Sequence, residues 1–394
     1  MKAKGGAGRP MALKSPIYLD YHATTPVDPR VLAAMLPYFS EHFGNAASRT
    51  HAFGLRAEAA VSAAREVVAE GLGAEPREIV FTSGATESNN LALLGAAHAG
   101  RARGEHVVTS SIEHRAVLDP CRALEREGFR VTYLPPDPFG ATVPSAVAAA
   151  LTDRTILVSL SAANNEIGTL NALREIGRIC RERGVLFHTD AAQAFGKIPI
   201  AVHDAGIDLL SLSAHKICGP KGAGALYVRV LNPKVRLEPV LFGGGHERGL
   251  RPGTLDVPAL VGFGAAVRLA LAEREDEQAR VRALRDRLEA RFLAEVPGAF
   301  VNGHPTERLA GNLNVGFPGL RADDLMMDVR DVAVSAGSAC TSASPEPSHV
   351  LRGIGRSAEE AASSIRFGLG RFTTSEEVET AAERFVAAAR RRKA

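Results

Sequence analysis

A strand–helix–strand unit in the middle of the chain decides the fold: Thr155-Ile156-Leu157-Val158-Ser159-Leu160, a helical pattern over residues 173–183, and Val185-Leu186-Phe187-His188-Thr189. Both apolar runs have the length of a buried strand. Short strands that alternate with helices favour a mostly parallel sheet with helices on both of its faces.

The same alternation extends outward from this unit in both directions. Further strands are predicted at residues 79–82, 107–109, 130–134, 208–211 and 225–228, and helical patterns cover residues 55–72, 86–99, 116–127 and 145–151. We therefore expect an α/β fold with a mostly parallel, seven-stranded sheet. Ligands of such sheets bind beyond the carboxyl ends of the strands, so the residues that follow each strand are the candidates for chemistry.

The pattern of charged and apolar residues changes after about residue 257. Residues 258–293 carry a long charged helical pattern, residues 310–335 predict short strands and turns, and residues 376–391 predict a last helix. We expect a large domain over residues 26–257, a smaller α+β domain formed by residues 15–25 and 258–394, and a flexible N-terminal tail over residues 1–14.

Composition excludes several classes of protein. Of 394 residues, 45% are hydrophobic and 23% are charged, as in soluble globular proteins, and no run of about 18 apolar residues predicts a membrane span. The 47 basic and 44 acidic residues leave a net charge of +3, which is too balanced for a nucleic-acid-binding surface. The four cysteines form neither a disulfide framework nor a metal-binding pair, and no secretory segment is recognised, so we expect a cytoplasmic protein.

The first candidate site follows the strand at residues 79–82, where the sequence reads Thr82-Ser83-Gly84-Ala85-Thr86. A strand that runs through a glycine turn into a helix presents amide groups and the positive end of the helix dipole, which suit a phosphate. Gly84 lets the backbone approach a ligand closely, and Thr86 offers a hydroxyl. An ordinary capped helix would have the same sequence signature.

Two further candidates follow strands later in the chain. Asp190 ends a buried strand, where a carboxylate needs a partner: a protonated pyridine nitrogen, a Mg²⁺ ion or a helix N-terminus. Lys216 stands among small and apolar residues, where desolvation lowers the pKa of a lysine as a Schiff-base amine requires. Ser213 and His215 flank it as donors for a phosphate. A lysine, a carboxylate and a phosphate turn are together the three protein parts of a pyridoxal 5′-phosphate site.

Two polar residues that follow other strands fit the same site. His114 comes after the strand at residues 107–109 and can stack on a cofactor ring and move protons, because imidazole titrates near neutral pH. Asn165 comes after the strand at residues 155–160 and can hydrogen-bond a ring hydroxyl. Each of them alone could be a satisfied polar residue, but their shared position at strand ends favours the site.

The second domain adds a thiol and a guanidinium group. Cys340 lies in Ser335-Ala336-Gly337-Ser338-Ala339-Cys340-Thr341-Ser342-Ala343-Ser344, a run of small residues that predicts a mobile, exposed loop and a reactive thiol. The other three cysteines are expected to be packing residues, namely Cys121, Cys180 and Cys218. Arg366 offers a planar fork for a substrate carboxylate, although a surface ion pair would look the same in sequence.

These motifs resemble those of the cysteine desulfurases of the IscS/NifS type, which are fold-type I pyridoxal phosphate enzymes of the class V aminotransferase group. The resemblance runs from Tyr18-Leu19-Asp20-Tyr21-His22 to Arg366-Phe367-Gly368-Leu369-Gly370-Arg371-Phe372, and it is closest at residues 82–90, 164–168, 188–193, 213–222, 243–254 and 335–344. It implies the fold-type I architecture, with a large cofactor-binding domain. It also implies conversion of L-cysteine to L-alanine, with the sulfur transferred to Cys340 as a persulfide.

The resemblance implies a role for each matching residue. Lys216 would hold the cofactor and move the Cα proton, Asp190 would partner the pyridine nitrogen, and His114 would stack on the ring as an acid/base. Arg366 and Asn165 would bind the substrate. The remaining cofactor contacts would be Asn165 and Gln193 at the ring hydroxyl, Ala85, Thr86, Ser213 and His215 at the phosphate, and Thr254 at the phosphate of the other subunit. The last contact implies a homodimer with shared active sites.

The segment that continues to His349 resembles the long-loop group of the family, which hands sulfur to many acceptors. The implied partners are an iron–sulfur scaffold protein and proteins of tRNA thiolation. No resident metal is expected, although Cys340 could transiently share a [2Fe–2S] cluster with a scaffold protein. We find no match to the extended C-terminal segment with which housekeeping members engage the scaffold, since the sequence ends at Arg392-Lys393-Ala394, and this leaves the scaffold partner open.

Two other classes of function fit part of the pattern. A selenocysteine lyase or an amino-acid aminotransferase would share the fold and the cofactor, although an aminotransferase needs no thiol. A scaffold protein that had kept the fold without activity would have no need of Lys216, Asp190, His114 and Cys340.

Overall fold

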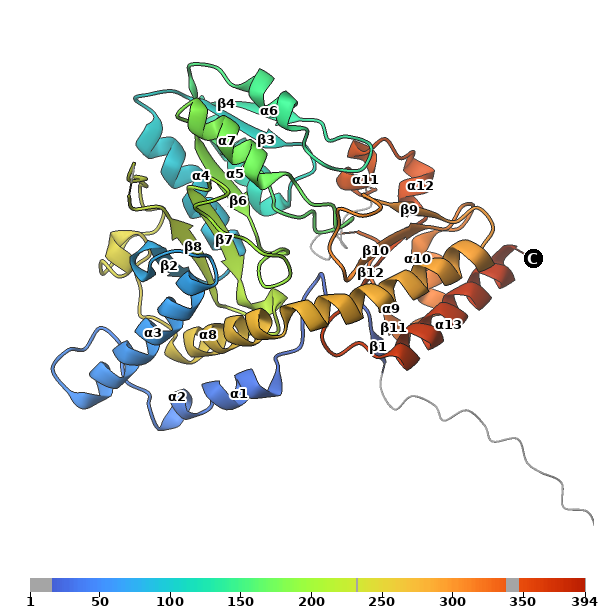
Figure 1. The fold of residues 1–394 in the computed structure, drawn as a ribbon, viewed down its shortest axis with the longest axis horizontal. Coiled ribbons are helices and arrows are strands. Elements are labelled where there is room, and N and C mark those ends of the chain that lie inside the picture. Colours follow the sequence, from blue (N-terminus) through green and yellow to red (C-terminus); the bar gives the residue numbers. More distant parts are fainter. Residues whose placement is uncertain (1–15, 232, 338–346, 394) are drawn as a thin grey trace, which may run out of the picture.

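A seven-stranded sheet forms the centre of the larger part of the protein in its computed structural model, which describes residues 16–231, 233–337 and 347–393 (Figure 1). Its strands are β2 (Ile79–Thr82), β3 (His106–Ser110), β4 (Arg130–Leu134), β5 (Thr155–Ser159), β6 (Leu186–Asp190), β7 (Leu209–Ser213) and β8 (Gly224–Val228). They are ordered β2-β8-β7-β6-β5-β3-β4. The strands from β4 to β7 pair in parallel, and β8 is antiparallel to both of its neighbours. The predicted α/β class with a mostly parallel sheet is confirmed.

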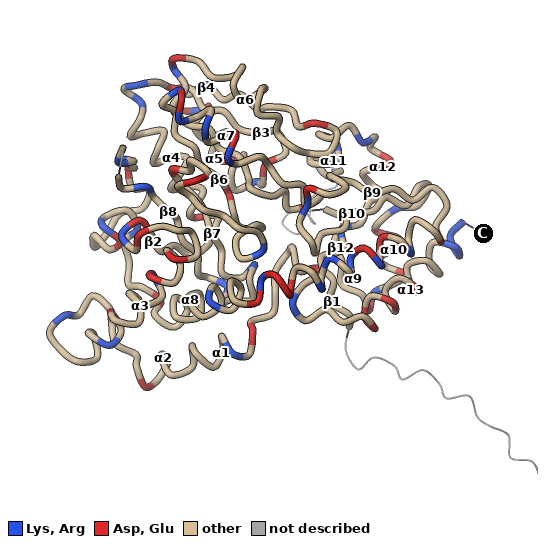
Figure 2. Tube along the Cα trace, in the orientation of Figure 1, with Lys and Arg blue, Asp and Glu red and all other residues tan. Residues whose placement is uncertain are grey.

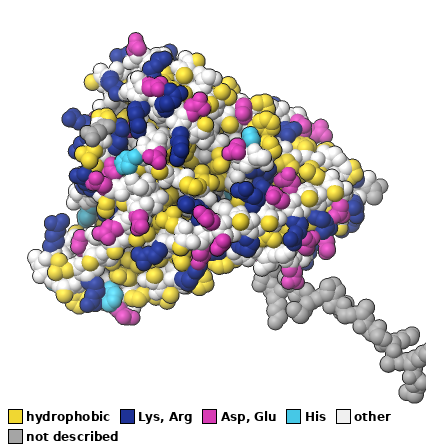
Figure 3. Space-filling model, viewed as in Figure 1, with side chains coloured by type: hydrophobic (Ala, Val, Ile, Leu, Met, Phe, Trp, Pro, Cys, Tyr) yellow, Lys and Arg dark blue, Asp and Glu magenta, His cyan; other side chains and the backbone are white. Residues whose placement is uncertain are grey.

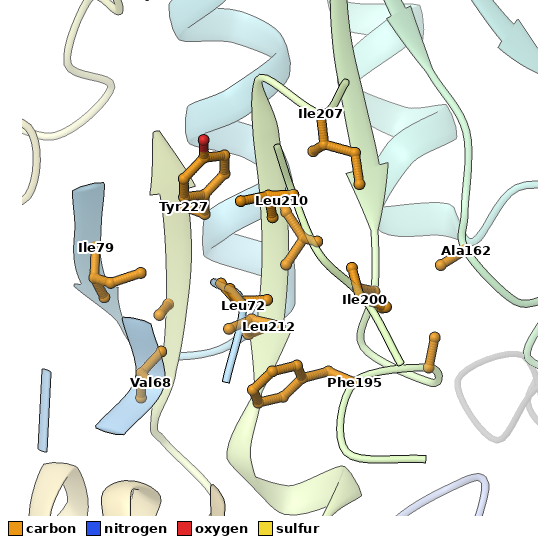
Figure 4. Close-up of a cluster of buried hydrophobic side chains, with 14 of the residues drawn as sticks. Val68, Leu72, Ile79, Ala162, Phe195, Ile200, Ile207, Leu210, Leu212 and Tyr227 are labelled. Atoms are coloured by element: carbon orange, nitrogen blue, oxygen red, sulfur yellow. The ribbon is translucent and has the colours of Figure 1, made fainter. Parts of the chain in front are cut away.

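Helices cover both faces of this sheet. On one face lie α3 (Ala52–Glu70), α6 (Pro144–Ala150), α7 (Leu173–Glu182) and α8 (Val257–Ala272), and on the other lie α4 (Ala85–Gly100) and α5 (Arg115–Arg126). Successive strand residues alternate between the two cores, so Leu210 and Leu212 of β7 pack with the first group of helices and Leu209 packs with the second. Figure 4 shows Leu210 and Leu212 beside Tyr227, Val68 and Leu72 in the first core.

A second core forms around a three-stranded antiparallel sheet of β9 (Phe300–Asn302), β10 (Asn312–Gly316) and β12 (Ser364–Gly368). The helices α9 (Arg274–Glu295) and α13 (Ser375–Lys393) pack on it. In this core the ring centroids of Phe292 and Phe367 are 5.0 Å apart. The N-terminal strand β1 (Ile17–Tyr18) pairs with β11 (Val332–Ala333), so residues from both ends of the chain share this core.

The helical segments that remain are short: α1 (Pro29–Met35), α2 (Pro37–Ser40), α10 (Ala322–Asp328), α11 (His349–Gly353), α12 (Ala358–Ala362), and the 3₁₀ turns η1 (Pro76–Glu78), η2 (Ala214–Lys216) and η3 (Glu247–Gly249). The helix α10 corrects the prediction that residues 310–335 form only strands and turns. Two acidic residues in its first turn stabilise its amino end, and Leu325 anchors it in the second core.

The single helix predicted over residues 258–293 is also wrong. It is divided at Glu273, whose backbone leaves the helical region at φ −102° and ψ 2°. The apolar helix α8 packs in the core of the large sheet, whereas the charged helix α9 packs in the second core. The helix breaks where the core against which it packs changes. No glycine or proline marks this break in the sequence.

The division of the chain into a large domain and a small domain stays a prediction, and α8 packs with the large sheet although it follows residue 257. The predicted N-terminal tail, residues 1–14, lies outside the described residues. Figure 2 shows basic and acidic residues interspersed along the trace. Among the described helices, none is long and apolar enough to span a membrane.

Candidate active site

A cavity of about 480 Å³ lies beyond the carboxyl ends of the central strands. The segments that follow β2, β3, β5, β6 and β7 all contribute to its wall. It is lined by every cofactor residue that the sequence predicts within one subunit: Ala85, Thr86, His114, Asn165, Asp190, Gln193, Ser213, His215 and Lys216. The structure therefore brings together residues that are up to 131 positions apart (85 to 216).

The turn between β2 and α4 forms a close-fitting cradle. Gly84, the residue before α4, has a φ of 150°, which side chains rarely adopt, and no side chain caps the amino end of the helix. Gly224 of the neighbouring strand β8 leaves room for this turn, because a Cβ there would lie 2.5 Å from the Cα of Gly84. The amide groups at the start of this 16-residue helix and the hydroxyl of Thr86 suit a phosphate.

His215 completes the cradle as a neutral donor. Burial, with smaller contributions from the charges of Lys216, Lys221 and Lys197, lowers the pKa of His215 to about 4. Its Nδ1 lies 3.0 Å from the hydroxyl oxygen of Thr24. A neutral ring that accepts a hydrogen bond from Thr24 at Nδ1 carries its proton on Nε2, where it can donate to a phosphate.

The carboxylate of Asp190 is buried and held by two donors. The side-chain amide of Asn89 donates to Oδ2 at 2.7 Å, and the backbone amide of Ala192 donates to Oδ1 at 2.9 Å. Each carboxylate oxygen keeps a lone pair for a further partner, such as a protonated pyridine nitrogen. The role of Asn89 cannot be read from the sequence, because nothing local distinguishes it from other polar residues of α4.

The ε-amine of Lys216 is anchored on a segment from the start of the chain. It donates to the carbonyl oxygens of His22 at 2.5 Å and Ala23 at 2.8 Å. The side-chain amide of Gln193 donates to the same carbonyl of His22 at 2.9 Å. Residues 22–23 therefore form part of the support of the site, although the sequence analysis gave them no role.

The loop that carries His114 is tied to its neighbours by a buried carboxyl group. Oε1 of Glu113 accepts a hydrogen bond from the amide of Ser161 at 2.9 Å, which joins the ends of β3 and β5. The backbone carbonyl of Glu113 lies 3.0 Å from Nε2 of His349. Burial, with a further contribution from the charge of Asp190, raises the pKa of Glu113 to about 8. The sequence gives no sign of this role for Glu113, because a glutamate in a loop has the signature of a solvated residue.

Arg366 lies behind the wall of the cavity and does not line it. The guanidinium group is 1% exposed, is paired with Asp20 at 2.9 Å, and donates to the backbone carbonyl of Asn165 at 2.9 Å. The alternative of a surface ion pair is therefore wrong, because the guanidinium group is buried. Its Nε has no hydrogen-bond partner among the residues that the structure describes.

The predicted residues outside this wall lie in different places. Thr254 is exposed and does not line the cavity of its own chain. Cys340 lies outside the described residues, but the two ends of its segment meet at Glu166. The hydroxyl of Ser348 donates to Oε2 of Glu166 at 2.5 Å, and a Cβ on Gly337 would lie 3.8 Å from the same oxygen. The other three cysteines are buried, as predicted: Cys121, Cys180 and Cys218.

The donor set fits pyridoxal phosphate. The uncapped helix end accepts an anion, the buried carboxylate of Asp190 can partner a ring nitrogen, and the amine of Lys216 lines the same cavity. Within residues 16–231, 233–337 and 347–393, no group of three or more His, Cys, Asp or Glu residues could hold a metal ion.

Known proteins are similar to this chain in sequence and in fold. The class-V aminotransferase family matches residues 17–380. Cysteine desulfurase IscS of Anaeromyxobacter dehalogenans is 59% identical over 95% of this chain and 92% of its own length. A solved NifS-like protein superposes with a TM-score of 0.88 at 35% identity, covering 94% of this chain and 98% of the other. A solved structure described as SspA in complex with cysteine gives a TM-score of 0.80 at 40% identity, over 91% of this chain and 100% of the other.

These matches span nearly the whole chain and include both cores and the cavity between the strand ends and α4. The chain therefore belongs to the class-V aminotransferase family, within its group of cysteine desulfurases.

Proposed function

We propose that this chain is a pyridoxal phosphate-dependent cysteine desulfurase, which converts L-cysteine to L-alanine and transfers the sulfur to Cys340 as a persulfide. The observation that carries the proposal is the cavity at the strand ends, whose wall contains nine predicted cofactor residues from five strand ends. Similarity over 95% of the chain to a protein named cysteine desulfurase supports the same activity.

The wall of the cavity would hold the cofactor at both ends. The amino end of α4 would bind the phosphate with Thr86, Ser213 and His215, and Asp190 would accept a hydrogen bond from the protonated pyridine nitrogen. The bound cofactor supplies an electron sink for the Cα–H bond of the substrate. The hydrogen bonds that Asp190 receives from Asn89 and Ala192 fix its orientation toward that nitrogen.

Lys216, His114 and Arg366 would act on the cofactor ring and the substrate. Lys216 would anchor the cofactor and then move the Cα proton, because its amine lines the cavity. His114, whose Nδ1 caps α5, would lie over the ring and exchange protons. Arg366 would bind the substrate carboxylate by giving up its pairing with Asp20.

The sulfur step needs a thiolate that reaches the substrate, and we assign it to Cys340. The thiolate attacks the sulfur of cysteine, an S–S bond forms, and the Cβ–S bond breaks with its electron pair left on the carbon skeleton. After protonation that skeleton is alanine, so one thiol and one cysteine give one persulfide and one alanine without an external oxidant. The described ends of the Cys340 segment meet at Glu166, beside Asn165 in the cavity wall, which supports this assignment.

A homodimer is part of the proposal. Large apolar side chains are exposed on α1, α2 and the start of α3, where Figure 3 shows hydrophobic side chains at the lower edge of the molecule, and Phe242 is 85% exposed. A second copy that covered this surface would remove apolar area from water. Thr254 follows Phe242 closely in the sequence and is also exposed. In the dimer, Thr254 would complete the phosphate site of the second copy.

The sulfur acceptors, the cellular location and the roles of the two domains are also part of the proposal. Persulfide sulfur would go to an iron–sulfur scaffold protein and to other acceptors such as tRNA-thiolation proteins, in the cytoplasm. We also propose that residues 26–257 act as the cofactor domain and that residues 15–25 and 258–394 act as the domain that carries Cys340.

The test is a product count with purified, cofactor-loaded protein. L-cysteine and a thiol reductant are added, and alanine and sulfide are measured for the parent and for Cys340→Ala. The parent should release alanine and sulfide in equal amounts. The variant should still change the visible absorption of the bound cofactor when cysteine is added, but it should release little sulfide.

Other outcomes would point to other functions. Sulfide release by Cys340→Ala at the parent rate would contradict the role of that thiol. A parent enzyme that acts only on selenocysteine would be a selenocysteine lyase, and one that needs a 2-oxo acid would be an aminotransferase. Protein that binds no pyridoxal phosphate would contradict an enzymatic role altogether.

A further inference from the structure

A second cavity, of about 30 Å³, also has Lys216 in its wall. We call it the rear cavity, and its polar wall includes His22, Thr25, Lys197, Lys216, Cys218 and Glu277. Lys216 lines both this cavity and the larger one at the strand ends. Lys216 therefore contributes to two cavities, of which only the larger is assigned to the cofactor and the substrate.

The rear cavity can hold water. About 10–15 Å³ is enough for one water molecule when polar partners are present, so this volume has room for one or two. Its wall includes His22, which is 3% exposed, and also Glu277 and Gln278 of α9, which are both partly exposed. Buried and partly exposed residues therefore share this wall with Lys216.

The ring of His22, a residue of this wall, lacks hydrogen-bond partners among the described residues. Neither of its ring nitrogens has a hydrogen-bond partner in the part of the chain that the structure describes, although the side chain is almost fully buried. A buried polar group without a partner is costly, and ordered water is the usual remedy. Burial lowers the pKa of His22, and the charges of Lys197, Arg366 and Lys216 lower it further, so the ring is neutral and offers one donor and one acceptor.

His22 is also the residue to which Lys216 is bonded, since the ε-amine donates to its carbonyl oxygen at 2.5 Å. We propose that water in the rear cavity links the imidazole of His22 to Lys216 and exchanges the protons of Lys216 with solvent while the substrate covers its other side. This inference rests on the proposed function, in which Lys216 takes a proton from Cα and later returns one to Cα. In each exchange one solvent proton replaces one substrate proton on the amine, so the charge of the site is unchanged.

His22 would then be a positioning residue for the water that serves Lys216. The experiment runs the reaction in D₂O with ordinary L-cysteine and measures, by proton NMR, the fraction of product alanine that keeps protium at Cα. The parent should give alanine that is mostly deuterated at Cα. The variant His22→Phe keeps a ring of similar size without nitrogens, and we expect the protium fraction to rise severalfold.

A second variant approaches the same cavity from another element. Ala270→Val adds two methyl groups from α8 and removes no polar group, because Ala270 lines the rear cavity with its Cβ alone. It should raise the protium fraction in the same direction, also when His22→Phe does not fold. His203→Phe is the matched control, because the side chain of this histidine is 55% exposed and lies outside both cavities.

The outcomes separate this inference from the proposed function. Equal protium fractions in the parent and both variants would overturn the rear-cavity exchange, and so would a parent that already keeps its protium. A fall in turnover with an unchanged protium fraction would show that His22 is only structural, which also overturns it. If the parent forms no alanine at all, the proposed function itself fails.

Discussion

Replacing Glu113 by glutamine should make the protein less sensitive to alkaline pH. The side chain of Glu113 is 1% exposed, and burial, with a further contribution from the charge of Asp190, raises its pKa from 4.5 to about 8. Between these two values the folded protein holds a proton that the unfolded chain has lost. The stability that this proton contributes is complete below the unfolded pKa and is lost as the pH rises through the folded pKa.

The magnitude follows from the two pKa values. Between about pH 5.5 and about pH 8, this carboxyl group alone lowers the free energy of unfolding by about 3 kcal/mol, since each pKa unit corresponds to about 1.4 kcal/mol. For a chain of this length, that change lowers Tm by about 3 to 4 °C. Glutamine has nearly the same shape, stays neutral, and can still accept the hydrogen bond from Ser161 that Glu113 now accepts at 2.9 Å.

The assay is differential scanning calorimetry of the parent and of Glu113→Gln at both pH values. The Tm of the variant relative to that of the parent should rise by about 3 to 4 °C on going from about pH 5.5 to about pH 8. Glu175→Gln removes one negative charge at an exposed position of α7 and should show no such rise. The reasoning would be refuted if the Tm of Glu113→Gln and that of the parent changed in parallel with pH.

Two further substitutions test the cofactor site. Asn89→Leu removes the 2.7 Å hydrogen bond to Asp190, and because hydrogen bonds to charged groups contribute about 1.5–3 kcal/mol, pyridoxal phosphate should bind about 10 to 100 times more weakly in an equilibrium titration of the apoprotein. Unchanged affinity would mean that Asp190 needs only one donor. Gly224→Ala places a Cβ 2.5 Å from the backbone of Gly84 and must displace the phosphate turn. It should weaken pyridoxal phosphate more than pyridoxal, and an equal loss for both ligands would argue against a phosphate cradle there.

Much of the large sheet could be predicted from the sequence because its strands are short apolar runs between helices. The strands at residues 79–82 and 130–134 have their predicted bounds in the structure. The break at Glu273 could not be predicted, because α8 and α9 are both helical and differ only in the core against which they pack. The helix α10 was missed for a related reason, since a seven-residue helix shows little periodicity.

The candidate site, like the fold, could be predicted from the sequence only in part. Asp190 and Lys216 stand directly after apolar runs, where a charged side chain is conspicuous, and the structure places both in one cavity. The groups that orient them were not predictable in this way. Asn89 and Glu113 act through contacts with Asp190 and Ser161 that are 101 and 48 residues distant in the chain.

The sequence by itself determined the order of the strands and helices of the large sheet and the residues that stand at the strand ends, because hydrophobic periodicity and chain punctuation are local properties. Only the tertiary structure decided which side chains meet. Arg366 is paired with Asp20, which lies 346 residues earlier, and Lys216 rests on the carbonyl of His22, which lies 194 residues earlier. No local pattern encodes such pairs, because they depend on the path by which the two cores bring both ends of the chain to one site.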